Sequence, residues 1–420
     1  MGQIRFRSAV APLRKNFAPA PAHLPGVDKA VAELQPSEPL HCLRPQVLRA
    51  TARRFVDAFA EAVGGHVLYA VKCNPDPSVL RHLAKGGVKH FDCASPAEIR
   101  LVRSMFPNAP IHYMHPVKNR AAIRDAYFNQ EVRDFSLDSD EELTKILEET
   151  GYAGDLGLMI RLAMPKGQAA YDLSAKFGAP VEEAASLLRR ARGVGRRVGI
   201  CFHVGSQCMN PQAYEVALAL AGEVIRLAGV EIDVMDVGGG FPVSYPDMTP
   251  PPLADYMAAI KRGIAALDLP KTTEIWCEPG RALVAAGGSI VVQVDKVKGD
   301  ELFVNDGVYG SLSDAGVPAF KFPCRVIRAE GVRTQTAELK PFAFWGPTCD
   351  SADRMAGPFW LPADIREGDW IEIGQLGAYG ATLRTAFNGF DQARLVEVSD
   401  LPLLATPGYG IAARLPDSIV

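Results

Sequence analysis

Short apolar runs alternate with longer segments of helical spacing between residues 45 and 290. The runs are about strand length and rich in β-branched and aromatic residues, which favours strands over helices. They cover 66–71, 90–95, 111–116, 134–139, 156–163, 198–205, 234–240 and 274–281. Between them, helical patterns cover 96–106, 140–150, 181–192 and 214–228. The pattern predicts eight strand–helix units in succession.

Eight such units match a (β/α)8 barrel in number and length. A doubly wound open sheet is the alternative, but no glycine-rich first turn supports it. After about residue 286, short alternating runs separated by turns predict a second, mainly β domain. We therefore expect an α/β protein with three parts. Residues 1–44 form an arm that contributes to the β domain, 45–285 form the barrel and 286–420 form the β domain.

Composition narrows the class of protein. The formal net charge of -3 over 420 residues argues against a general nucleic-acid binder. No apolar stretch reaches the length of a membrane span. The eight cysteines include no CxxC pair, which predicts a reducing cytoplasm and no metal site. The first 27 residues carry four basic residues and no acid. A transit peptide is one interpretation, but we favour a mobile or partner-contacting arm.

Lys72 stands at the end of the first apolar run, directly before turn-forming residues. Its amine could form a Schiff base with a carbonyl, including that of pyridoxal phosphate. Most lysines at strand ends are solvated surface charges, so the position alone decides nothing. In a barrel, however, the carboxyl ends of the strands form the active site. Asp92, His115, Arg161 and His203 also fall at such ends.

Two further strand ends carry residues that suit an anion. Gly238-Gly239-Gly240 follows an apolar run, and glycines there let backbone N–H groups approach a phosphate. A plain flexible turn is the alternative. Gly280 and Arg281 form a second such element. Glu278 beside them needs a cationic partner at a barrel mouth, and a protonated pyridine nitrogen would serve. A surface Glu–Arg pair is the simpler explanation.

Three more side chains suit the same chemistry. His203 could stack on a flat ring, and Ser206 could donate to a phosphate, although a lone histidine is more often structural. Cys349 and Asp350 couple a proton donor with a carboxylate. A Cys-Asp dipeptide alone is not diagnostic.

Taken together and in order, these segments resemble the ornithine decarboxylase family, the fold-type III pyridoxal-phosphate decarboxylases of basic amino acids (Orn/Lys/Arg decarboxylase class II). The similar segments span about residues 45–395. They are YAVKCNP at 69–75, FDCASPAEI at 91–99, MIRLA at 159–163, LSAKFG at 173–178, FHVGSQ at 202–207, DVGGGFP at 236–242, CEPGR at 277–281, NDGVYGS at 305–311, GPTCDSAD at 346–353, GAYG at 377–380 and FNGF at 387–390. The resemblance implies an alanine racemase-like barrel with a β domain.

The resemblance also implies roles for individual residues. Lys72 holds pyridoxal 5'-phosphate through a Schiff base, Glu278 pairs with the pyridine nitrogen, and His203 stacks on the ring. Asp92 lies close to Lys72, and Arg161 lies near the cofactor. The residues that hold the phosphate are Ser206, Gly238, Gly239, Gly240, Gly280, Arg281 and Tyr379.

The same resemblance implies a homodimer with shared active sites. Cys349 from the partner subunit protonates the α-carbon of the substrate, and Asp350 binds its distal ammonium. An aspartate that the eukaryotic enzymes carry after NDGVYGS is absent here, and Asp314 or a water could substitute for it. We therefore expect decarboxylation of L-ornithine, and L-lysine as a further substrate, to give putrescine or cadaverine for polyamine biosynthesis. The alternatives are a decarboxylase of arginine, diaminopimelate or carboxynorspermidine, or a binding protein that has lost catalysis.

Overall fold

The computed structural model describes residues 14–15, 24–165, 169–171, 176–328 and 338–404. Arg5 and Arg7 of the expected arm and residues 173–175 of the LSAKFG segment lie outside this part of the chain. The described residues form two compact units. One contains those within 1–51, 244–249 and 283–420, and the other contains 52–243 and 250–282. No helix in the described part is long and apolar enough to cross a membrane.

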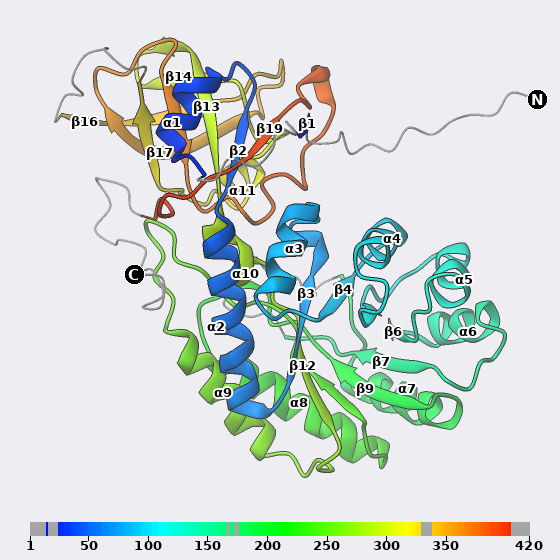
Figure 1. Ribbon diagram of the computed structural model, residues 1–420. Coiled ribbons are helices and arrows are strands. Elements are labelled where there is room, and N and C mark those ends of the chain that lie inside the picture. Colours follow the sequence, from blue (N-terminus) through cyan, green and yellow to red (C-terminus); the bar gives the residue numbers. More distant parts are fainter. Residues whose placement is uncertain (1–13, 16–23, 166–168, 172–175, 329–337, 405–420) are drawn as a thin grey trace, which may run out of the picture. The chain divides into compact units, whose positions relative to one another are not determined.

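The second unit is a closed barrel of parallel strands (Figure 1). Eight described strands follow one another around it, and the last pairs with the first through Trp276↔His66 and Cys277↔Val67. This closure confirms the predicted barrel and excludes the open sheet. The strands are β3 (His66–Ala70), β4 (His90–Cys93), β5 (Ile111–Tyr113), β6 (Asp134–Leu137), β7 (Gly157–Arg161), β9 (Arg197–Cys201), β11 (Val234–Asp236) and β12 (Glu274–Cys277).

Helices alternate with these strands, and polar side chains mark where several of them begin. Asp76, Ser95, Asn119 and Ser139 each accept a hydrogen bond from a backbone N–H of the first turn. Such caps satisfy N–H groups that have no partner inside the helix, so each βα loop has a fixed end. The helices are α2 (Pro45–Val63), α3 (Pro77–Lys85), α4 (Pro96–Met105), α5 (Arg120–Phe128), α6 (Asp140–Glu149), α7 (Val181–Val194), α8 (Gln212–Ala228), α9 (Leu253–Ala265) and the short α10 (Arg281–Val284).

The barrel interior is a packed core. Leu68, Met159, Val234 and Trp276 lie together there, each at most 1% exposed. A packed interior leaves no channel for a ligand, so binding must occur at an end of the barrel. The carboxyl ends of the strands carry the chemically suggestive residues that the sequence predicts.

The first unit is built on a sheet whose central strand is β13 (Gly288–Lys298). This strand pairs with β2 (Leu40–Leu43), β14 (Glu301–Val304) and β18 (Trp370–Ile373). The remaining strands of the sheet are β1 (Arg14–Lys15), β15 (Cys324–Ile327), β16 (Leu339–Trp345), β17 (Arg354–Pro362) and β19 (Arg394–Glu397). The predicted mainly β fold is therefore confirmed, and β2 comes from the segment before residue 45.

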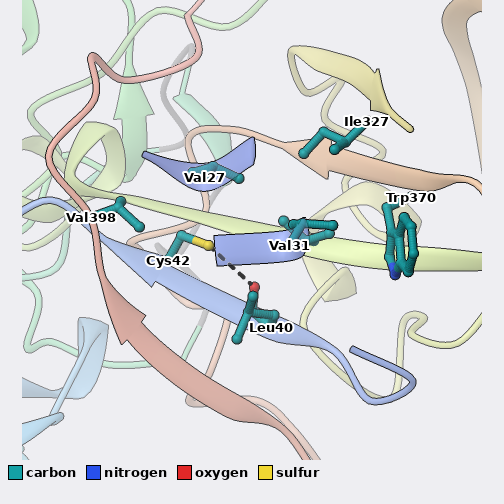
Figure 2. Close-up of a cluster of buried hydrophobic side chains, with 8 residues drawn as sticks. Val27, Val31, Leu40, Cys42, Ile327, Trp370 and Val398 are labelled. Carbon is teal, nitrogen blue, oxygen red and sulfur yellow. Dashed lines mark hydrogen bonds between the residues drawn. The ribbon is translucent and has the colours of Figure 1, made fainter. Parts of the chain in front are cut away.

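An amino-terminal helix packs against this sheet. α1 (Val27–Leu34) places Val27 and Val31 against Leu40 of β2 and Trp370 of β18 (Figure 2). The indole N–H of Trp370 donates to the Pro36 carbonyl at 3.0 Å. Segments from both ends of the chain thus share one apolar cluster with the central strands.

A buried ion pair lies beside this cluster. Arg44 donates to Glu372 at 2.7 Å, and both side chains are 1% exposed. Ser289 on β13 donates to the same carboxylate at 2.7 Å, and Arg325 on β15 donates to its other oxygen at 2.7 Å. Because every oxygen of Glu372 has a donor, the desolvation cost of the buried charge is offset. The network joins the residue directly after β2 to β13, β15 and β18.

Glu372→Gln tests this network. The substitution keeps the shape of the side chain but removes the nearer countercharge of the buried Arg44 guanidinium, leaving Asp400 at 3.5 Å, so the free energy of unfolding should fall by about 3–5 kcal/mol. Denaturant unfolding of the full chain measures the loss. Glu301→Gln is the matched control, because Glu301 forms only a partly exposed pair with Arg354 at 3.8 Å. The control should lose less than about 1 kcal/mol. Equal losses in the two variants would contradict the assigned importance of the network.

Candidate active site

Lys72 and Asp92 form an ion pair at the carboxyl end of the barrel strands. Lys72 lies in a single 3-10 turn, η1 (Val71–Cys73), directly after β3. Its Nζ atom lies 2.6 Å from Oδ2 of Asp92 on β4. The Asp92 side chain is 1% exposed, whereas that of Lys72 is 43% exposed. The carboxylate therefore holds a lysine amine that small molecules can still reach.

Glu278 follows β12 and is buried with an incomplete set of hydrogen bonds. Its side chain is 4% exposed, and its Oε1 atom has no hydrogen-bond partner among the described residues. Burial raises the pKa of this carboxyl well above its ordinary value, and the neighbouring Asp236 and Asp92 raise it further. A carboxyl in this setting binds a proton or a cationic donor strongly. A protonated ring nitrogen would supply the required positive charge and a donor.

His203 lies two residues after β9 and is held by its own loop. Its Nδ1 atom accepts a hydrogen bond from the Gly205 N–H at 3.0 Å. Burial lowers the pKa of this imidazole well below its ordinary value, and the cations Arg161 and Lys72 lower it further. The ring is therefore neutral at physiological pH. A neutral, fixed ring is suited to stacking on a flat ligand.

The three glycines after β11 form a loop with no room for side chains. A Cβ atom on Gly238 would lie 1.8 Å from the Phe202 carbonyl, and one on Gly239 would lie 3.0 Å from Nε2 of His203. Gly238 and Gly240 also have φ values of +68° and +107°, which favour glycine. The Gly238 carbonyl accepts the Glu278 N–H at 2.8 Å. The loop is thus a tight glycine turn, here called the cradle, fixed to the segment that carries Glu278.

The other predicted cofactor residues of the barrel lie on neighbouring segments. Arg161 ends β7, and Ser206 begins the short strand β10 (Ser206–Cys208). A Cβ atom on Gly280 would lie 3.0 Å from Cβ of Cys73, so this glycine lets the Glu278 segment approach the Lys72 turn. Arg281 begins α10 and is buried.

The β unit carries the remaining predicted residues. Cys349 is exposed, and its N–H donates to Oδ1 of Asn388 at 3.1 Å. Asp350 accepts a 2.5 Å hydrogen bond from the Tyr309 hydroxyl. The Ala352 N–H and then the Tyr309 hydroxyl lower the pKa of Asp350, so its carboxylate is charged at neutral pH. Asp314 is buried at the start of α11 (Ser313–Gly316), and Tyr379 is half-buried with a φ of +58°.

Sequence reasoning missed three residues that organise these groups. Tyr309 fixes Asp350, and Asp236 adjoins Glu278. Asp353, 1% exposed, accepts hydrogen bonds from the Val308 N–H at 2.8 Å and the Thr348 hydroxyl at 2.7 Å. Asp353 therefore fixes the loop that presents Cys349 and Asp350. Each of the three stands inside a segment used for the resemblance, which was the available signal.

The barrel with its lysine, buried glutamate and glycine cradle defines a pyridoxal-phosphate enzyme of the barrel type. Two family models match the chain. The pyridoxal binding domain of the pyridoxal-dependent decarboxylases matches residues 46–285, and their C-terminal sheet domain matches 284–377. The chain belongs to this family of pyridoxal-dependent decarboxylases.

Named relatives differ in activity. The chain is 34% identical to a lysine/ornithine decarboxylase of Selenomonas ruminantium over 80% of this chain and 84% of the relative. It is 33% identical to antizyme inhibitor 2 of Xenopus laevis over 77% and 74%. The structure of Vibrio vulnificus lysine/ornithine decarboxylase with cadaverine has a TM-score of 0.75 at 30% identity, covering 89% of this chain and 98% of that one. The arginine decarboxylase of Paramecium bursaria Chlorella virus has a TM-score of 0.76 at 28% identity, covering 89% and 99%.

The residues present fit the cofactor of this family, pyridoxal phosphate. The Oε1 atom of Glu278 lacks a donor that a protonated ring nitrogen would supply. Gly238, Gly239 and Gly240 form a backbone turn in which no side chain fits, and such glycine turns at strand ends suit a phosphate. The chain is therefore a carboxy-lyase of pyridoxal-phosphate type by family.

Gly239→Ala tests the cradle. The added methyl group would lie 2.7 Å from the Glu278 carbonyl and 3.0 Å from the His203 ring, so the loop must shift. The affinity for pyridoxal phosphate should fall by about tenfold or more, since overpacking costs about 1–3 kcal/mol. Absorbance titration of the cofactor-free protein measures this. Gly193→Ala on α7 is the control, because nothing lies within 4 Å of the added atom. An unchanged affinity in Gly239→Ala would contradict the cradle.

Proposed function

We propose that the protein is a pyridoxal-phosphate-dependent L-ornithine decarboxylase that also accepts L-lysine. The observation that carries the proposal is the charged Asp350 carboxylate, held by Tyr309 on the loop that also presents Cys349. A fixed carboxylate selects substrates with a cationic end, because an unpaired cation would be costly to bury. Membership in the decarboxylase family supports the reaction, and the relatives named for ornithine and lysine support the substrate class.

In this proposal the barrel residues bind and orient. Lys72 is the amine that attaches the cofactor, and Asp92 holds that amine in place. Glu278 pairs with the ring nitrogen, and Arg161 lies near the cofactor. His203 covers one face of the ring as a neutral imidazole. The phosphate ligands are Ser206, Gly238, Gly239, Gly240, Gly280, Arg281 and Tyr379.

When bound, pyridoxal phosphate supplies a sink for the electron pair that remains when the bond to CO2 breaks. The chain supplies the rest. Glu278 keeps the ring nitrogen protonated, which makes the sink effective. The Cys349 thiol delivers a proton to the α-carbon after CO2 leaves. Asp350 fixes the far end of the substrate, so that the α-carbon and its carboxylate are held in one orientation.

We further propose a cytoplasmic homodimer in which Cys349 and Asp350 act at the site of the partner subunit. The product, putrescine or cadaverine, would enter polyamine biosynthesis. Asp314 is a weaker substrate ligand in this scheme because it is buried at the start of α11. A water in place of the absent second aspartate is the alternative.

Two other functions remain as alternatives. An arginine decarboxylase would also use Asp350, which can bind a guanidinium, and one similar structure has this activity. Diaminopimelate is disfavoured because its distal carboxylate would meet Asp350. A non-catalytic binding protein is suggested by the similarity to antizyme inhibitor 2. The presence of Lys72, His203, Glu278 and Cys349 favours an enzyme.

Turnover of single amino acids tests the proposal. CO2 and diamine release should be found with ornithine and lysine. Asp350→Asn removes the anchoring charge and should lower kcat/KM for ornithine by about 100-fold or more. Asp300→Asn, on the exposed surface of the same unit, is the control and should leave turnover unchanged. No CO2 from ornithine, lysine or arginine, with the cofactor bound, would refute the proposed function.

Mixing two inactive variants tests the shared site. Lys72→Ala and Cys349→Ala should each be nearly inactive as homodimers. After subunit exchange in equal amounts, half of the dimers contain one intact site, so activity should recover to about a quarter of the wild-type value. Tags on the two variants confirm that mixed dimers form. Mixed dimers without activity would show that Lys72 and Cys349 act within one chain.

A further inference from the structure

Asp236 is a buried carboxylate to which the proposed reaction assigns no role. It ends β11 and is 0% exposed. Its Oδ1 atom accepts a hydrogen bond from the Gly238 N–H at 2.8 Å. Its Oδ2 atom is also buried and receives no hydrogen bond from an amide, hydroxyl or cationic group of the described residues. A buried oxygen without a donor is costly, so this position requires a physical explanation.

The neighbouring strand places Glu278 beside it. β11 and β12 are parallel, with Asp236 opposite Trp276. Side chains alternate along a strand, so residue 278 follows Trp276 on the same face as Asp236. Trp276 packs in the barrel core, which identifies that face as the interior. The two carboxyls act on one another, since each shifts the pKa of the other.

The charges around this pair do not balance if both carboxyls are ionised. Three carboxylates, on Asp92, Asp236 and Glu278, face two cations, on Lys72 and Arg161. The other titratable groups nearby are the neutral His203 and the thiols of Cys201 and Cys277, whose pKa values burial raises. Arg281 is a further buried cation but is not among the charges that act most strongly on either carboxyl.

One proton on the pair removes this excess negative charge. Burial raises the pKa of Asp236 to about 6, although the Gly238 N–H and Glu278 partly oppose the rise. The pKa of Glu278 is raised more strongly, by burial and then by Asp236. Without a ring nitrogen, the proton therefore resides mainly on Glu278 and is shared with Asp236.

We propose that Asp236 is a positioning residue that shares one proton with Glu278, and that its charge strengthens Glu278 as the partner of the protonated ring nitrogen. The inference rests on the role proposed above for Glu278. Asp236 is itself anchored by the Gly238 N–H, so the glycine cradle and the ring-nitrogen partner are held by one side chain.

The proton balance gives the binding of pyridoxal phosphate a pH dependence. At low pH the proton for the ring nitrogen comes from Glu278 when the cofactor binds. The Glu278 O–H bond breaks, an N–H bond forms with the lone pair of the nitrogen, and no proton is taken from solvent. At pH values above the pKa of the pair, the proton must come from solvent unless the free cofactor already carries it. Affinity should then fall as the pH rises.

Asp236→Asn separates charge from shape. The amide oxygen can still accept the Gly238 N–H, and the amide N–H2 can donate to Glu278. Glu278 then becomes a weaker base. Affinity of the full-length, cofactor-free protein for pyridoxal phosphate should fall by roughly 10- to 100-fold near pH 8, and the decline with pH should begin about one unit lower. Absorbance titrations from pH 6 to 9 measure both. Asp255→Asn, an exposed carboxylate on α9, is the control.

A second ligand excludes a merely structural role. An analogue of pyridoxal phosphate with carbon in place of the ring nitrogen should bind wild type and Asp236→Asn equally. The melting temperature of cofactor-free Asp236→Asn should not fall, since a buried charge is removed. Equal losses for both ligands, or an unchanged pH profile, would overturn the inference. These binding measurements contain no amino acid substrate. If the pH profile of cofactor binding shifts as expected but no decarboxylation is found, only the proposed substrate reaction is refuted. If Glu278→Gln leaves the affinity for pyridoxal phosphate unchanged, the proposed role of Glu278 is refuted.

Discussion

The barrel site depends on three carboxylates that are buried at the carboxyl ends of β4, β11 and β12. Asp92, Asp236 and Glu278 are each at most 4% exposed, and each has one buried oxygen without a hydrogen bond among the described residues. Burying such oxygens costs free energy that packing elsewhere must offset. The Lys72 amine compensates the charge of Asp92 through the other oxygen, Oδ2. The unpaired buried oxygen of Glu278 still costs free energy. A cationic ring nitrogen would relieve this cost, which favours binding of the cofactor.

Glu372 in the β unit is satisfied in the opposite way. Both oxygens of Glu372 have donors within the fold, from Arg44, Ser289 and Arg325. A saturated network of this kind holds strands in register but leaves no binding capacity for a ligand. The contrast is informative because both units bury carboxylates to similar extents. Asp92, Asp236 and Glu278 keep unsatisfied oxygens at the barrel mouth, where binding is expected, whereas Glu372 is saturated in the sheet, where rigidity is needed.

The periodicity of the sequence was sufficient to predict the barrel, since each apolar run corresponds to one observed strand. It was insufficient for β17 (Arg354–Pro362), because Gly357 and Pro358 interrupt the alternating pattern in mid-strand. The strand ends identified Lys72, His203 and Glu278 as candidates because their types are chemically suggestive. Asp236 and Tyr309 were missed because nothing in their residue type or local sequence marks them as functional. Their importance comes from what they contact, and a contact between distant residues cannot be seen in local sequence.

Under the proposed function, the choice between ornithine and lysine would follow from how Asp350 is held. Its carboxylate is fixed by Tyr309 and by the Ala352 N–H, and Asp353 fixes the surrounding loop. A rigid anchor sets one distance to the distal ammonium. Lysine is one methylene longer than ornithine, and a methylene is worth only about 1–3 kcal/mol in discrimination. A single anchoring carboxylate, as proposed for Asp350, would therefore reject neither substrate strongly. Sharp preference would require a second polar group that only one of them reaches, and burial of Asp314 makes it poorly suited to that task.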